Sequence, residues 1–143
     1  MRAATKAMVG AMTLVLIGCG GGAPEARATP CPEVSAASDL NLLPRDVDLA
    51  RFATVTETSV ANDYLNATAV AETTVVELDP QLQRALVDVG YQIIGHDNEG
   101  FEAEIFFARS EETLGTFRLR EGPCDGQVTV RFLYTSPRYV RAS

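Results

Sequence analysis

Alternation of apolar and polar side chains in the last third of the chain constrains the fold more than any other feature. It runs through residues 101–108, 115–120 and 128–134, and the turn-forming residues 122–126 separate the last two segments. A period of two places one face of a strand against a core and the other in water. Three such strands joined by short turns predict an antiparallel meander with one solvated face.

The solvated face of these strands is charged. Glu102 and Glu104 occupy polar positions of the first strand, and Arg118, Arg120 and Arg131 occupy those of the next two. Exposed cross-strand ion pairs contribute only about a few tenths of a kcal/mol each. The pattern therefore predicts ion pairs on a solvent-facing surface and does not by itself indicate a site.

One amphipathic helix is predicted at residues 79–90. Asp79 suits the N-cap, Pro80 the first helical position and Gly90 the position after the last turn. The apolar residues recur at intervals of three and four, as a single helical face requires: Leu82, Ala85, Leu86 and Val89.

Further strands are predicted on both sides of this helix. Residues 52–60 and 64–77 are rich in Thr and Val and flank a turn, so they predict a hairpin. Residues 91–95 predict a strand that leads into a turn at His96–Gly100, and residues 34–43 predict a loop. The expected fold is α+β, with one helix on a predominantly antiparallel sheet and the order β-β-α-β-β-β-β.

The beginning of the chain has the pattern of a secretory signal peptide. Arg2 and Lys6 precede an uncharged, mostly apolar run at residues 7–17. A membrane-spanning helix needs roughly 20 apolar residues, and this run is shorter. Ala26-Arg27-Ala28 offers a general signal-peptidase site, so an ordinary secreted protein and a retained membrane helix remain as alternatives.

Leu16-Ile17-Gly18-Cys19 gives the sharper interpretation. It resembles the lipobox of bacterial lipoproteins, and the whole chain resembles small actinobacterial lipoproteins with a Gly-rich tether and an α+β domain. The resemblance implies cleavage between Gly18 and Cys19, a covalent lipid on Cys19, and anchoring to the cell membrane on its extracytoplasmic face. The expected organisation is a signal peptide at 1–18, a tether at 19–32, one domain at 33–136 and a tail at 137–143.

Three cysteines occur in the chain. If Cys19 is acylated, Cys31 and Cys124 remain as a pair, and export would place them where disulfides persist. A Cys31–Cys124 disulfide would close a loop of more than 90 residues. Two isolated cysteines are a poor metal site, because structural zinc usually needs four ligands.

The formal net charge is −7, and removal of Arg2 and Lys6 with the signal would make it more negative. Nucleic-acid binding needs a basic surface, so an acidic chain speaks against that class of partner. The bilayer, reached through acyl chains, is the expected partner, together with an envelope protein or an apolar ligand.

Candidate catalytic residues are few. His96 is the only histidine, which excludes a multi-histidine metal site, and no nucleophile-elbow motif accompanies it. Glu102 and Glu104 could serve carboxylate chemistry, but acids two apart occur on many strands. The acids from Asp97 to Glu104 lack the spacing of a calcium loop.

The expected function is therefore non-enzymatic binding or interaction at the cell envelope, with no metal and no cofactor beyond the lipid. An apolar ligand could lie between helix and sheet, against Leu82, Leu86, Phe101 and Phe107. The alternatives are a small envelope hydrolase that uses carboxylates and a structural surface protein without a ligand.

Overall fold

A computed structural model describes residue 31 and residues 33–140. Its frame is a six-stranded sheet in the order β1-β2-β6-β5-β4-β3, and every neighbouring pair is antiparallel. The strands are β1 (Thr54–Ala61), β2 (Tyr64–Ala71), β3 (Gln92–Asn98), β4 (Glu102–Ser110), β5 (Thr113–Glu121) and β6 (Val128–Thr135). The helices are α1 (Val75–Asp88), the short α2 (Pro137–Val140) and a 3-10 turn, η1 (Leu49–Arg51). The predicted α+β class and element order are confirmed.

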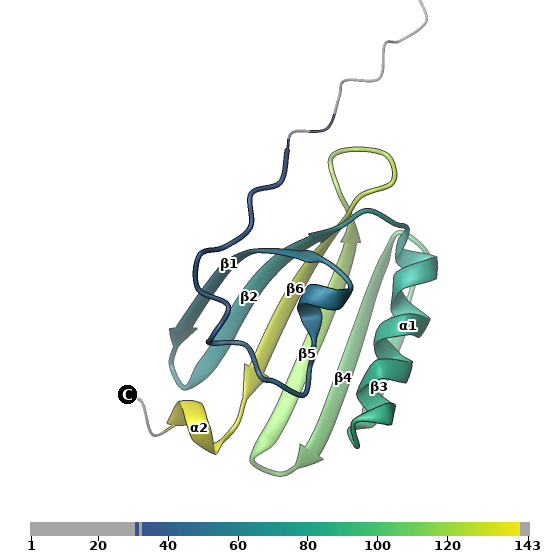
Figure 1. Cartoon of the computed structure of the whole chain (residues 1–143). Helices are drawn as coiled ribbons and strands as arrows, with labels where there is room; N and C mark the ends of the chain where they lie inside the picture. The colour runs from purple at the N-terminus through teal and green to yellow at the C-terminus, as the bar shows by residue number, and fades with distance from the viewer. Residues whose placement is uncertain (1–30, 32, 141–143) are drawn as a thin grey trace, which may run out of the picture.

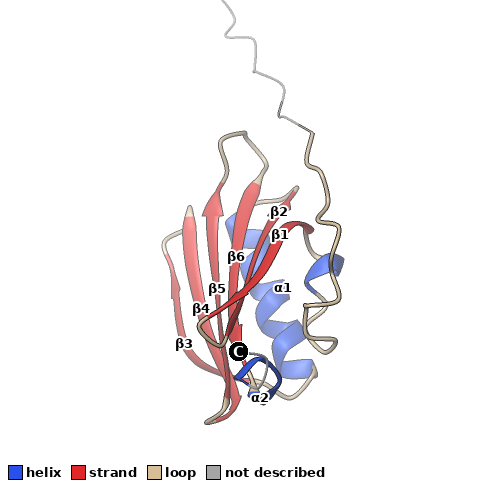
Figure 2. Cartoon of the chain, turned by 90° about the vertical axis from the view of Figure 1, so that its left-hand side faces the viewer, coloured by secondary structure: helices blue, strands red, loops and turns tan. Residues whose placement is uncertain are grey.

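The sheet has one covered and one bare face (Figure 1, Figure 2). Helix α1 and the segment that contains η1 lie on the same side, which we call the inner face. No described segment lies on the other side, the outer face. β6 lies between β2 and β5, so the last strand joins the first hairpin to the meander.

Helix α1 begins earlier than the sequence predicted. The predicted strand at 64–77 ends at Ala71, and the helix starts at Val75 with Thr74 as its N-cap. The Thr74 hydroxyl accepts a hydrogen bond from the Glu77 N–H at 3.3 Å. The Thr and Val residues at this junction favour strand by propensity, but burial of Val75 and Leu78 against the sheet outweighs that preference. Asp79 is consequently a buried residue within the helix and not its cap.

Strand β3 is longer than predicted, because His96, Asp97 and Asn98 belong to it and not to a turn. A β-bulge between Ile93 and Gly95 shifts the alternation. His96 then pairs with Ile105, whose side chain is buried in the core, so His96 shares the inner face with Asn98 two positions on. The remaining turn uses Gly100, which has a φ of 88°.

The core is an aromatic stack on the inner face. Phe107, Phe117 and Phe132 are buried, and the Phe117 and Phe132 ring centroids lie 4.7 Å apart. The Phe107 ring lies over Gly115, which pairs with it on β5. Buried aromatic rings carry much of the apolar area of a small core, so this stack is its centre.

Segments near both ends of the described chain pack on the rest of the domain. The Ala37 N–H donates to the Val55 carbonyl at 2.7 Å, which places the N-terminal segment along the edge strand β1. Tyr139 of α2 is buried and donates a hydrogen bond to the Leu42 carbonyl. Helix α2 thus contacts the loop before η1.

Candidate functional site

The predicted apolar ligand face is divided by the structure. Leu82, Leu86 and Phe107 are buried in the core, whereas Phe101 is 50% exposed beside the β3–β4 turn. Leu82 and Leu86 also line a cavity of about 110 Å³ between α1 and the η1 segment. Sites for small organic molecules usually measure roughly 300–1,000 Å³. This space therefore suits nothing larger than a few waters or a very small molecule.

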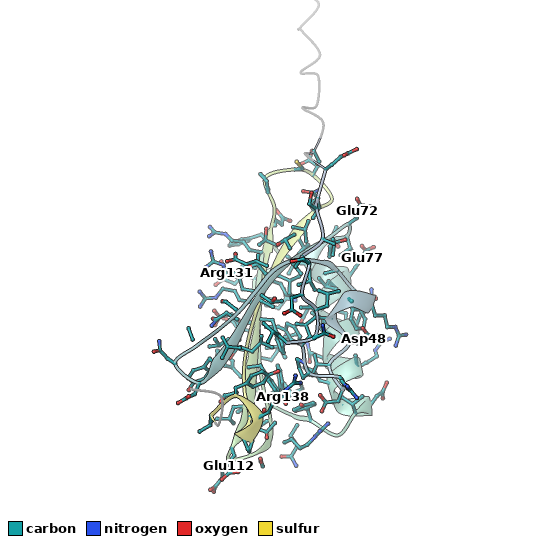
Figure 3. All side chains as sticks on the ribbon, turned by 60° about the vertical axis from the view of Figure 1, so that its left-hand side comes forward. Asp48, Glu72, Glu77, Glu112, Arg131 and Arg138 are labelled. Atoms are coloured by element: carbon teal, nitrogen blue, oxygen red, sulfur yellow. The ribbon has the colours of Figure 1, made fainter. Side chains whose placement is uncertain are left out.

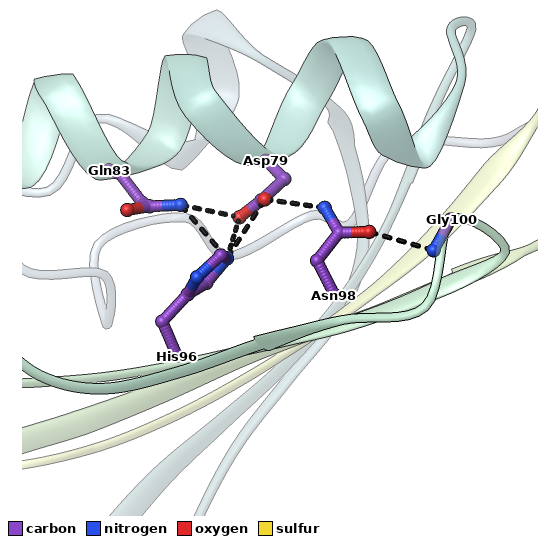
Figure 4. Close-up of polar contacts among 5 residues, drawn as sticks. All are labelled: Asp79, Gln83, His96, Asn98 and Gly100. Atoms are coloured by element: carbon purple, nitrogen blue, oxygen red, sulfur yellow. Dashed lines mark hydrogen bonds and ion pairs between the residues drawn. The ribbon is translucent and has the colours of Figure 1, made fainter.

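A polar cluster links α1 to β3 (Figure 4). The Asp79 side chain is 5% exposed, and His96 Nε2 lies 2.9 Å from its Oδ2 atom. Asn98 Nδ2 donates to Oδ2 at 2.6 Å, and Gln83 Nε2 donates to Oδ1 at 2.9 Å. The Asn98 Oδ1 atom in turn accepts from the Gly100 N–H at 2.7 Å. A buried carboxylate is tolerable only with such a set of donors, and here it has three.

This cluster has the ingredients of a carboxylate–imidazole pair but not the surroundings of an active site. Neither Asp79 nor His96 lines the helix–sheet cavity or the hollow on the outer face. We therefore assign it a structural role, as a polar lock between helix and edge strand. The N-cap pattern at Asp79 hid this cluster in the sequence; the i, i+4 spacing of Asp79 and Gln83 was the available signal.

A second polar cluster fixes the loop before η1 to the core. Tyr91 Oη donates to Asp46 Oδ2 at 3.1 Å and lies 2.8 Å from Tyr134 Oη. Arg109 Nη1 donates to the same Asp46 oxygen at 2.6 Å, and its guanidinium lies 4.1 Å from the Tyr91 ring centroid. Burial raises the pKa of Tyr91 and of Tyr134. Both phenols therefore stay protonated at neutral pH and act as hydrogen-bonding groups of the core.

The outer face carries a hollow with a volume of about 510 Å³. Phe106 and Leu133, each 39% exposed, contribute its apolar part, and Arg118 and Arg131 its cationic part. Figure 3 shows Arg131 on the side of the sheet away from Asp48 and Glu77. The hollow is open to solvent. Side chains of four strands line it, and no described segment covers it.

The predicted ion pairs occur on this face in part. Arg118 forms an ion pair with Glu104, and its Nε atom lies 4.0 Å from Glu102. Arg120 and Arg131 have no hydrogen-bond or ion-pair partner among the residues that the structure describes. Glu102 and Glu104, the carboxylates considered for hydrolysis, thus lie beside Arg118. Arg120 and Arg131 are available to bind an external group.

Cys31 and Cys124 are the two cysteines in the part of the chain that the structure describes. Both are free thiols in this structure. A hydrogen bond with Cys124, followed by burial, raises the pKa of the Cys31 thiol. The two thiols are therefore neighbours although 92 residues separate them in sequence. Cys19 and the cleavage position after Gly18 lie outside the described residues.

No group of three or more His, Cys, Asp or Glu side chains among the described residues could hold a metal ion. None of the helices in that part of the chain is long and apolar enough to cross a membrane. Comparison with models of known protein families gives no match, and neither does comparison with curated proteins.

Proposed function

We propose that this protein is a lipid-anchored interaction domain of the cell envelope, held at the membrane by Cys19 and contacting a partner protein through the outer face of its sheet. The observation that carries the proposal is the bare face itself. Phe106 and Leu133 are each 39% exposed around a hollow of about 510 Å³ on this face. Exposed apolar groups rimmed by polar ones are typical of protein-binding surfaces.

The anchor supports this role physically. One acyl chain gives marginal membrane binding, and two or more give stable attachment. A tether of about a dozen residues spans on the order of 20 Å as a flexible coil. The domain would stand off the bilayer, which suits the net charge of −9 that remains when Arg2 and Lys6 are removed with the signal from a chain of −7.

A partner protein fits the geometry better than an apolar ligand or a substrate. The cavity at Leu82 and Leu86 measures only about 110 Å³. Hydrolysis would need titratable groups that converge in a cleft. Glu104 is instead paired with Arg118, and Asp79 with His96.

Two measurements test the proposal. The first is mass spectrometry of the protein extracted from its own membranes, which should show a diacylglyceryl-modified Cys19 as the first residue. A chain that starts after Ala28 would contradict the anchor.

The second is photo-crosslinking in intact cells. A photoreactive amino acid at Leu133, on the outer face, should yield a protein adduct. The control is the same amino acid at Val87, which is 57% exposed on α1. The protein identified in the adduct should then be purified separately. When it is added to the wild-type domain in solution, the NMR signals of outer-face residues should shift. Equal crosslinking at both positions would contradict an outer-face interface.

A further inference from the structure

The strand register defines a row of six side chains across the outer face. Pairings between neighbouring strands connect them in one line, from β3 through β4, β5, β6 and β2 to β1. In that order they are Asp97, Glu104, Arg118, Arg131, Thr68 and Glu57. The row is acidic at both ends and cationic in the middle.

Arg118 and Arg131 face each other directly at the centre of this row. Like charges at directly opposed positions destabilise a sheet. Glu104 neutralises Arg118, but Arg131 has neither a hydrogen bond nor an ion pair within the described chain. A guanidinium offers five N–H donors in a planar fork that matches a carboxylate. Arg131 is exposed to solvent, so its donors are available to one anionic group at the centre of the row.

An apolar row lies beside the charged one. Leu133 is two positions from Arg131 on β6, and Phe106 is two positions from Glu104 on β4. Thr116 separates them on β5, opposite both. An anion that binds at Arg131 would thus have apolar surface within reach, which favours an amino-acid side chain with apolar neighbours.

We propose that the outer face binds a protein segment with a carboxylate at its centre, apolar side chains next to that carboxylate and a basic residue on each flank. The carboxylate binds Arg131 and Arg118, the apolar side chains pack on Leu133 and Phe106, and the basic residues meet Asp97 and Glu57. The inference deepens the proposed function and rests on it, because it names the chemistry of the partner at the same face.

The acids at the ends of the row set this specificity. A polyanion such as nucleic acid or an anionic membrane surface would meet Asp97, Glu104 and Glu57 as well as the arginines, on a chain of net charge −7. A partner with a single central carboxylate avoids that repulsion. With strands about 4.8 Å apart, each terminal acid lies roughly 12 Å from the midpoint of the arginine pair, which is three to four residues of an extended chain.

This spacing dictates a probe. It is a terminally blocked nonapeptide with Asp at the centre, Leu two positions to each side of it, Lys at both ends and Ala between them, because alternate side chains of an extended chain lie on one face. A matched peptide replaces the Asp with Asn. Binding to the isotope-labelled full domain is followed by NMR, which reports both affinity and position. Saturable shifts should concentrate on Thr116, Arg118, Arg131 and Leu133, and the Asn peptide should bind about tenfold more weakly.

Net charge makes this comparison stringent. The Asn peptide is more cationic and the protein is acidic, so non-specific attraction would make the Asn peptide bind more tightly. The variant Arg131→Gln should also weaken the Asp peptide about tenfold although it makes the protein more acidic. Arg84→Gln, on the exposed face of α1, is the matched control and should change nothing.

Equal binding of the two peptides, or shifts on α1 in place of the outer face, would overturn the proposed partner chemistry. Absence of saturable shifts would do the same. None of these results would touch the proposed function, which depends on acylation of Cys19 and on crosslinking at Leu133. Loss of crosslinking with intact peptide binding would instead reject the envelope role and keep the chemistry of the face.

Discussion

His96 Nε2 lies 2.9 Å from the buried carboxylate of Asp79, and the contact ties the only long helix of the described chain to an edge strand of its sheet. β3 has a free edge, and α1 packs on it through this polar contact as well as through apolar side chains. Edge strands need protection from pairing with other chains. The polar lock fixes α1 beside β3 and so contributes to that protection.

We expect Asp79→Ala to destabilise the domain by about 2–3 kcal/mol, because His96, Asn98 and Gln83 lose their common acceptor in a largely buried place. His96→Ala should cost less, about 1 kcal/mol, since the imidazole is one-third exposed to solvent. Asp88→Ala, in the exposed last turn of the same helix, is the control and should change little. Urea denaturation measures all three, and an equal loss for Asp79→Ala and Asp88→Ala would contradict the lock.

We expect Gly115→Ala to destabilise the core by about 1–3 kcal/mol through overpacking. An added Cβ would come within 2.7 Å of Phe107 Cε2 and closer still to Cζ, and that ring is fully buried. Gly95→Ala is the matched control, since the nearest atom there belongs to the half-exposed Phe106 ring at 3.2 Å. The second substitution Phe107→Leu should recover part of the loss in thermal unfolding. Strict additivity of the two changes would contradict a direct clash.

The sheet was predictable where the alternation was strict. β4, β5 and β6 each expose one face to water, so the alternation of their residues predicts both the strand and which side chains face the core. The start of α1 was not predictable from the sequence. Thr73, Thr74 and Val75 favour strand locally, and only packing against the sheet makes the helix begin there. The bulge in β3 was also hidden, and with it the inner position of His96.

The candidate site shows the same division. The sequence could place Glu104 and Arg118 on one solvated face, because both follow from the period of two. It could not show that Arg118 and Arg131 face each other, since that needs the register of β5 against β6. Phe101 was assigned to the inner side by alternation, but it lies in the turn before β4 begins and is exposed.

Glu77, in the first turn of α1, should make the free energy of unfolding decrease as the pH becomes acidic. Hydrogen bonds from the Thr73 hydroxyl, the Thr74 hydroxyl and the Thr74 N–H lower the pKa of Glu77 below its ordinary value of 4.5. A depressed folded-state pKa adds stability above the unfolded value, and this stability is lost as pH falls through the folded value. The variant Glu77→Gln should therefore be less stable than wild type at pH 7 and equal to it in strong acid. A constant difference across that range would contradict the linkage.

Thr74→Ala removes the N-cap of α1 and should cost about 1 kcal/mol at neutral pH. It should also weaken the acid dependence, because the Thr74 hydroxyl is one of the donors that hold Glu77 ionised. Thr113→Ala, at the start of β5 and outside any cap, is the comparison variant. If the stability of wild type and of Thr74→Ala changed with pH in the same way, the Thr74 hydroxyl would not be a donor that lowers the pKa of Glu77.

Cys31 and Cys124 should form a disulfide when the protein is exposed to a disulfide-bearing oxidant. Thiol–disulfide exchange would take two electrons and two protons from the pair and release the oxidant as two thiols. The raised pKa of Cys31 leaves little thiolate at neutral pH, so the reaction should accelerate with rising pH. The intact mass should fall by two hydrogens. The free energy of unfolding of the oxidised domain should exceed that of the reduced form by up to about 4–5 kcal/mol, because the bond closes a long loop. The paired variant Cys31→Ser with Cys124→Ser should match the reduced protein under both conditions; a wild-type chain that keeps both thiols in excess oxidant would contradict the pairing.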